Sequence, residues 1–247
     1  ALNGSSADVA AALDGTFADT YSGTATLTSN HSLAELVAIN NGTSGNITLN
    51  SNAVALTGST SDVKAALAGN VGAAYSGNIV LNDADNTSIA AADITTIESD
   101  TTGTITVSNN INLTGTSAEI AAAVADVNTF SGTPTATLGD AHTLAELKAI
   151  NNALSGTLTL NDVTVALSGS SADVAAALAG TFAAGYTGTA TLNDNHSLAE
   201  LVAINNGTSG NITLNSNAVA LTGSTSDVKA ALAGNVGASY TGNVVLN

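Results

Sequence analysis

Apolar residues recur along the chain in two short patterns, each typical of an amphipathic helix. In the first pattern, residues 6–13 read Ser-Ala-Asp-Val-Ala-Ala-Ala-Leu. Val9, Leu13 and Phe17 follow one another at four-residue spacing, which places them on one helix face. We call this a type A helix, and we expect that face to be buried.

The second pattern, at residues 32–39, reads Ser-Leu-Ala-Glu-Leu-Val-Ala-Ile and predicts a type B helix whose Leu33, Leu36 and Ile39 point inward. Both patterns span only two or three turns, a length at which an isolated helix is marginal in water, so we expect stacking to hold these helices. Counting both types, helices are predicted to start at Ser6, Ser32, Ser61, Ser88, Ser117, Thr143, Ser171, Ser197 and Ser226.

Short segments of alternating Thr and aliphatic residues follow the helices and predict half-buried strands. They lie at residues 24–27, 46–49, 78–81, 104–107 and 157–160. A second β-like segment, Ala53–Leu56 or Thr164–Leu167, follows some type B helices. Two paths are open for this second segment, because it fits either another face of the coil or a hairpin.

Strand, helix and strand in alternation predict parallel strands joined by crossover helices. The helix starts are separated by 26 to 29 residues, and a fixed period in this range indicates a repeat architecture. We therefore expect an α/β fold, a tandem-repeat solenoid of about nine coils of roughly 27 residues. Parallel strands would lie on one side and short helices on the other.

A longer repeat is superimposed on this period, since residues 2–82 and 167–247 differ at only ten of 81 aligned positions. All ten exchanges are between small or polar residues or replace Ile by Val, so both copies are expected to adopt one structure. The chain opens and closes in the middle of a repeat motif. We interpret residues 1–247 as a single solenoid array and as an excerpt of a longer one.

Composition narrows the possible partners. The net charge is −16 with only three Lys or Arg residues, which leaves almost nothing to neutralise phosphates, so a nucleic-acid partner is not expected. No apolar run approaches the ~18 residues that a membrane span needs, so membrane insertion is not expected either. Without cysteine the chain has no disulfide framework.

Eight of the nineteen acidic residues stand three positions after a Ser or Thr at a predicted helix start, the arrangement of a capping box. One predicted helix, near Ile89–Ile97, lacks this arrangement. The eight pairs are Ser5/Asp8, Ser32/Glu35, Ser59/Asp62, Thr116/Glu119, Thr143/Glu146, Ser170/Asp173, Ser197/Glu200 and Ser224/Asp227. We interpret these acids as helix caps rather than catalytic carboxylates.

Turns rich in Asn and Asp follow several strands and supply the oxygen ligands that calcium prefers. The calcium candidates are Asp83, Asp85, Asp140, Asp162 and Asp194. The alternative is Asx turns at strand ends, with Asn50, Asn82, Asn161, Asn193, Asn215 and Asn247 stacked as a ladder. The alternative is favoured, and no cofactor is expected.

Histidines and aromatic residues recur with the repeat. His31, His142 and His196 each stand just before a type B helix, and their spacing argues against a shared metal. Rings recur at Tyr21, Tyr75, Phe130, Tyr186 and Tyr240, and we expect each to fill a gap between Ala-rich helices. A sugar-binding stripe is the alternative for these rings.

The bias toward Ala, Thr, Asn, Ser and Gly, the near-identical long repeats, the absence of Cys and Arg, and motifs such as Gly45-Asn46-Ile47-Thr48-Leu49 carry a resemblance. In these respects the chain resembles the giant repetitive cell-surface and secreted proteins of cyanobacteria and other aquatic bacteria, of adhesin, surface-layer or fibre type. The resemblance implies an extracellular or cell-surface location. It rests on composition and period, so no functional residue is carried over.

These observations predict a non-enzymatic structural module, a spacer or the body of a surface fibre or filament, that associates end to end or with other surface components. The alternative is a repetitive binding surface for glycan, ice or calcium-dependent adhesion. An enzyme would need a cluster of residues that breaks the repeat. The divergent coil at 85–110 offers Asp93, Glu98 and Asp100 without a partner base.

Overall fold

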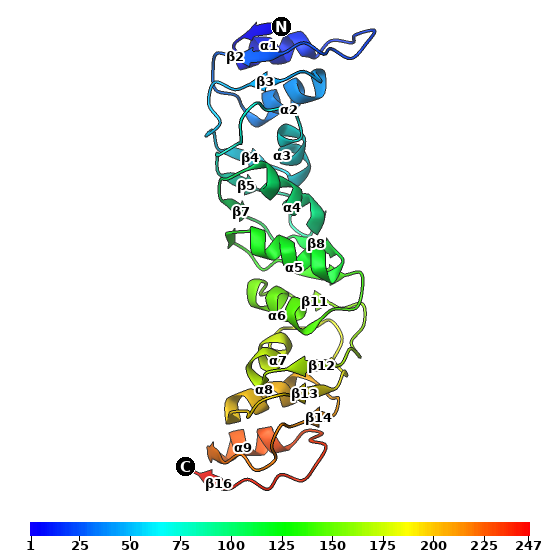
Figure 1. Ribbon diagram of the computed structural model, residues 1–247, viewed down its shortest axis with the longest axis vertical. Helices are drawn as coiled ribbons and strands as arrows, with labels where there is room; N and C mark the ends of the chain where they lie inside the picture. Colours follow the sequence, from blue (N-terminus) through cyan, green and yellow to red (C-terminus); the bar gives the residue numbers. More distant parts are fainter. The chain divides into compact units, whose positions relative to one another are not determined.

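The computed structural model describes residues 1–247 and shows an α/β chain in which short helices alternate with parallel strands (Figure 1). The chain falls into two compact units. The first contains residues 1–111 and 126–133, and the second contains residues 112–125 and 134–247. The predicted α/β class is therefore confirmed. No helix is both long and apolar enough to cross a membrane.

Nine helices are present, and eight begin within one residue of their predicted starts. Each of these starts carries a hydroxyl side chain that fixes the first turn. The helices are α1 (Ser6–Leu13), α2 (Leu33–Gly42), α3 (Thr60–Leu67), α4 (Ala91–Asp100), α5 (Ser117–Asp126), α6 (Leu144–Ala153), α7 (Ser171–Leu178), α8 (Leu198–Gly207) and α9 (Thr225–Leu232).

The strands are only two to four residues long. They are β1 (Leu2–Gly4), β2 (Ala25–Leu27), β3 (Ile47–Thr48), β4 (Leu56–Gly58), β5 (Ile79–Leu81), β6 (Ser88–Ala90), β7 (Ile105–Val107), β8 (Asn112–Gly115), β9 (Thr129–Phe130), β10 (Thr135–Leu138), β11 (Leu158–Thr159), β12 (Leu167–Gly169), β13 (Ala190–Leu192), β14 (Ile212–Thr213), β15 (Leu221–Gly223) and β16 (Val244–Leu246).

Neighbouring strands pair in parallel within each unit. The first unit contains the orders β1-β2-β3 and β4-β5-β7-β9, and the second contains β8-β10-β11, β12-β13-β14 and β15-β16. Helices cross over between partners, as in β1-α1-β2-α2-β3. Successive helices pack on one another, α1 on α2 and α2 on α3 in the first unit, and α6 through α9 in the second.

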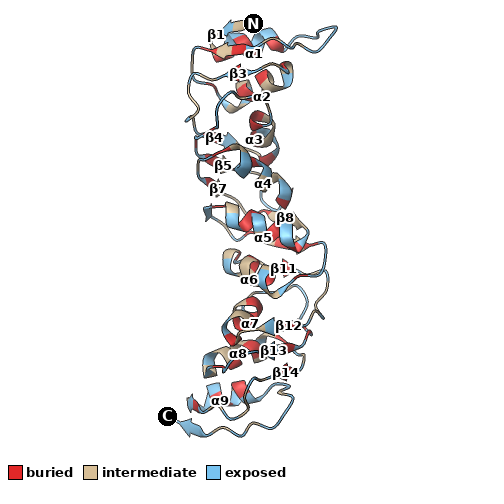
Figure 2. Ribbon diagram, viewed as in Figure 1, coloured by how far each residue is buried: buried red, intermediate tan, exposed pale blue.

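The core lies between each strand row and its helices (Figure 2). Around α1 and α2, the buried cluster combines Val9 and Leu13 from one helix with Ile39 from the next and with Ala25 and Ile47 from the strands. Alternation along β2 buries Ala25 and Leu27 and turns Thr26 outward, because successive side chains of a strand point to opposite faces.

Two expectations about the helices were wrong. Phe17 is not part of the buried face and is 47% exposed, because α1 ends at Leu13, two residues before Gly15. The helix expected from Ser88 begins at Ala91, because Ser88 to Ala90 are extended as β6. Its N-cap is Ala90, which makes no side-chain cap hydrogen bond, so nothing stabilises an earlier start.

Two paths were open for the second β segment, and the structure excludes the hairpin. Its strand starts at Leu56, the last residue of the predicted Ala53–Leu56 segment, and runs to Gly58. It pairs in parallel with β5, which rules out a hairpin with β3. The Val54 carbonyl accepts a hydrogen bond from the Tyr75 hydroxyl instead of from a neighbouring strand.

Candidate functional site

The helix starts concentrate the polar side chains of the chain, and all eight predicted hydroxyl caps are present. In each, the Ser or Thr oxygen accepts the backbone N–H of the acidic residue three positions later. Where the acid is Glu, its carboxylate also accepts the N–H of the capping residue, as Glu146 does from Thr143 at 2.8 Å.

The boxes that contain Asp differ from the prediction. Asp8 does not reach the N–H of Ser5; its carboxylate accepts the Ser5 hydroxyl at 2.7 Å. Asp62 and Asp227 do the same with their own capping serines. Aspartate is one methylene shorter than glutamate, so the reciprocal bond forms only in the four boxes built with Glu, at α2, α5, α6 and α8.

Three of the calcium candidates cap the type A helix that precedes them in the sequence. Asp83 accepts the N–H of Thr60, Asp140 that of Ser117 and Asp194 that of Ser171, each across 23 residues. Each donor is the first residue of a type A helix, where free N–H groups and the helix dipole favour a negative charge. At the equivalent position, Ser29 Oγ accepts the N–H of Ser6.

The other two calcium candidates are also engaged locally. Asp85 accepts the N–H of Asn110, and Asp162 accepts both the N–H and the hydroxyl of Thr164. The hydroxyl of Thr164, followed by its N–H, holds the pKa of Asp162 below its usual value. No three His, Asp or Glu side chains converge in a way that could hold a metal ion.

The predicted asparagine ladder does not form. Asn50 donates to Asn30 and Asn215 donates to Asn195, while Asn161 donates to the Gly139 carbonyl. A different set bridges the repeats at the other end of the helices. Asn40, Asn151 and Asn205 lie near the ends of the type B helices α2, α6 and α8. Their side-chain amides donate hydrogen bonds to carbonyls near the end of the next type A helix.

A buried hydroxyl connects consecutive helix starts. Ser117 is 2% exposed, and its hydroxyl donates to Glu146 of the next helix at 3.0 Å. Ser6 makes the same bond to Glu35, and Ser171 to Glu200. The N–H of Thr143, together with the hydroxyls of Thr143 and Ser117, holds the pKa of Glu146 below its usual value.

The three histidines lie where the sequence places them, directly before the N-caps of α2, α6 and α8, and all are buried. Sequence reasoning missed their partners. Nε2 of His31, His142 and His196 is hydrogen-bonded to the hydroxyl of Tyr75, Tyr186 and Tyr240, respectively, always across 44 residues. The constant 44-residue offset was a signal visible in the sequence.

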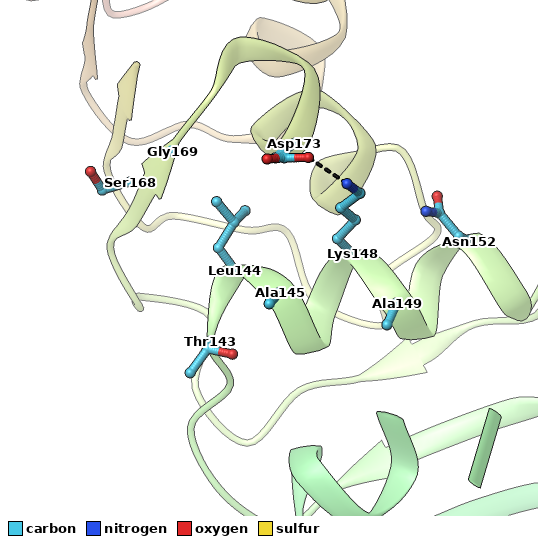
Figure 3. Close-up of a pocket in the computed structure, with 9 residues that line it drawn as sticks. All are labelled: Thr143, Leu144, Ala145, Lys148, Ala149, Asn152, Ser168, Gly169 and Asp173. Atoms are coloured by element: carbon cyan, nitrogen blue, oxygen red, sulfur yellow. Dashed lines mark hydrogen bonds and ion pairs between the residues drawn. The ribbon is translucent and has the colours of Figure 1, made fainter. Parts of the chain in front are cut away.

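A cleft of about 800 Å³ lies between α6 and α7 beside β12 (Figure 3). Leu144, Ala145 and Ala149 of α6 line it, and the Lys148 ammonium is paired with the Asp173 carboxylate across it. The hydrogen bond from Lys148, followed by that from Ser170, lowers the pKa of Asp173. The pair neutralises its own charges and adjoins no nucleophile–base arrangement.

A smaller cleft of about 220 Å³ lies in the first unit, beside the divergent coil. It is lined by Leu67, Val71, Tyr75, Asp100 and Thr101, among others. Burial raises the pKa of the Asp100 carboxyl. Of the other two acids named in this coil, Asp93 is paired with Lys64, and the structure brings neither of them into this cleft.

Threonines form rows on the outer face of the strands. In the second unit Thr114, Thr137 and Thr159 are in register on β8, β10 and β11. Ser168, Thr191 and Thr213 are in register on β12, β13 and β14. Thr159, Thr191 and Thr213 are exposed, whereas the flanking aliphatic residues of the same strands are buried.

No protein-family model, curated protein or solved structure matches the chain.

Proposed function

We propose that the chain is a non-enzymatic structural repeat module, a spacer or the body of a surface fibre outside the cell. The observation that supports this most strongly is the use of its polar side chains. Many of the acids, asparagines and histidines that resemble sites instead bond to residues of another repeat, as Asp194 and Glu200 both do with Ser171. Such a chain uses its polar side chains to hold successive repeats together, and the number of repeats then sets its length.

The finer architecture that goes with this proposal is one continuous solenoid of nine coils. If the helix spacing of ~8–10 Å sets the rise, nine coils span roughly 80–90 Å. A compact domain of this chain length has a radius of gyration of about 18 Å. Small-angle X-ray scattering tests the proposal: we expect a rod with a clearly larger radius, and a value near the compact one overturns it.

We further propose that copies associate with one another or with other surface components. The resemblance to surface proteins of adhesin and fibre type supports this association. Electron microscopy at rising protein concentration should show filaments that lengthen, and uniform single particles at every concentration contradict self-association.

A location outside the cell is the remaining part of this proposal. The resemblance to giant surface and secreted repeat proteins supports it, as does an acidic chain of net charge −16 with very few lysines, which suits high ionic strength. Immunogold labelling of intact cells of the source organism should place the protein on the surface or in the medium. Signal that appears only after the cells are permeabilised contradicts it.

A second candidate function, a repetitive binding surface for ice or glycan, is supported by the outward threonine rows. They present hydroxyls and methyl groups at the ~4.8 Å spacing of paired strands. Thermal hysteresis tests binding to ice, and a glycan array tests binding to sugar. Replacing Thr159, Thr191 and Thr213 by Lys should abolish either signal, and a signal that survives places the binding surface elsewhere. Calcium-dependent adhesion is tested by melting with and without calcium.

A further inference from the structure

Each histidine–tyrosine pair ends on a backbone carbonyl, and this fixes where the protons lie. The Tyr186 hydroxyl donates its only hydrogen to the carbonyl oxygen of Val165 at 2.7 Å. Its oxygen therefore accepts from His142, whose Nε2 lies 2.9 Å away and must carry a hydrogen. The neutral ring then has a bare Nδ1, and this atom is buried without any partner.

The same arrangement occurs three times. His31, Tyr75 and Val54 form one set, and His196, Tyr240 and Val219 form another, again with an unpartnered Nδ1. At one further place in the repeat both members are replaced together. Phe130 stands at the recurring aromatic position without a hydroxyl, and the residue 44 positions before it is Asn86. The pair is present or absent as a unit.

We propose that the three sets of residues form an acid-sensitive latch that loosens the stacked turns when the histidines are protonated. A second proton must go to Nδ1, which is buried and has no hydrogen-bond acceptor of the protein beside it. The histidines are only 3 to 4% exposed, and burying an unpaired charge is costly. Each set joins three connections of the chain, at the histidine, at the valine and at the tyrosine, so opening one set frees all three.

Nearby carboxylates raise the pKa of each histidine, but by less than burial lowers it. Burial lowers the pKa of His31, and Glu35 raises it in part. Burial likewise lowers the pKa of His142, and the charges of Asp162, Glu146 and Asp140 raise it in part. For His196 the opposing acids are Glu200 and Asp194. In all three the pKa lies below the ordinary value of 6.5.

The direction of the pH effect follows from these shifts. The unfolded chain binds protons more readily than the folded chain between pH 6.5 and the lower folded pKa. Stability is therefore complete above pH 6.5 and declines as the pH falls toward the folded pKa. The unfolding equilibrium constant rises about tenfold for each pKa unit of lowering at each histidine.

The test compares the whole chain with a triple variant, His31→Gln, His142→Gln and His196→Gln, by thermal melting from pH 7.5 to pH 5.0. Glutamine keeps an N–H donor and does not titrate. We expect the melting temperature of the unaltered chain to fall across this range, and that of the triple variant to stay nearly level. An unchanged pH slope in the variant overturns the latch.

A second measurement does not depend on the variant folding. The chain has only three histidines, so ¹⁵N NMR of the unaltered protein can follow each imidazole. We expect the Nε2–H tautomer at pH 7.5 and midpoints below 6.5 in the folded state. An Nδ1–H tautomer, or midpoints at or above 6.5, contradicts the proposal.

Discussion

Leu144 occupies the space in which a side chain at Gly169 would begin: a Cβ atom built there would lie 2.4 Å from Leu144 Cδ2. The same relationship joins Leu33 to Gly58 and Leu198 to Gly223. At these three positions the glycine before a type A helix thus lies against the flexible end of a leucine of the preceding type B helix. Leu144 is only partly buried, and its Cδ2 is the end of a flexible side chain that can move aside. We therefore expect Gly169→Ala to destabilise the fold by about 1 kcal/mol, the lower end of the usual cost of overpacking, measured by urea denaturation.

Gly185 provides the matched control for this substitution. No atom outside its immediate neighbours lies within 4 Å of a Cβ built there, and the other copy of the repeat carries Thr20 at this position. Gly185→Ala should therefore change stability far less than Gly169→Ala. Equal effects would show that contact with Leu144 is not the reason for the glycine.

Removing a single latch hydroxyl gives a second prediction. Tyr186→Phe leaves the Nε2–H of buried His142 and the carbonyl of Val165 without their partner. Unpaired buried groups cost about 1–3 kcal/mol, so urea denaturation should show a loss of that order. Tyr21→Phe is the control, since Tyr21 is only half-buried and pairs with no histidine. A comparable loss in both variants contradicts the assigned role of the hydroxyl.

The capping glutamates predict a separate, more acidic transition. Because the pKa of Glu146 is lowered from 4.5, its stabilisation is present above pH 4.5 and is lost as the pH falls through the folded pKa. Glu146→Gln keeps an acceptor oxygen but cannot titrate. We expect its stability to depend less on pH than that of the unaltered chain between pH 5 and pH 3. A curve parallel to that of the unaltered chain assigns the transition to other carboxyls.

The two copies of the long repeat supply a natural test of the cross-turn caps. Asp194 in one copy and Ser29 in the other each accept the N–H of the first residue of a type A helix. Asp194→Ala should cost about 0.5–2 kcal/mol, the usual range for loss of a helix cap, in thermal or urea unfolding. Asp194→Ser should restore most of it, and failure to do so contradicts the equivalence.

Local signals explain why the helix starts were predictable. A hydroxyl followed three residues later by an acid marks a first turn. The helix α4, whose start was misplaced, has Asp93 three residues after its N-cap Ala90 but no hydroxyl at the cap. Phe17 kept the four-residue spacing of Val9 and Leu13, but Gly15 intervenes and α1 ends before it. Periodicity alone therefore overestimated the length of this helix.

Contacts across the repeat were harder to predict, because they depend on how far each connection carries the chain. The bonds from Asp83, Asp140 and Asp194 cross 23 residues and those of the histidines cross 44. The repeat period alone does not distinguish separations of 23 and 44 residues from other separations. The paired loss at Asn86 and Phe130 is the sequence feature that distinguishes the second offset.

The short reach of these bonds has a consequence for how the chain folds. Hydrogen bonds between repeats join residues separated by about one or two repeats, from the 20 of Asn30 to Asn50 up to the 44 of His142 to Tyr186. Chains dominated by nearby contacts fold fast, since little loop entropy is lost before contacts form. A repeat that leaves the ribosome or a narrow pore therefore finds its bonding partners in the repeats that emerged just before it. Folding can then keep pace with the emergence of the chain.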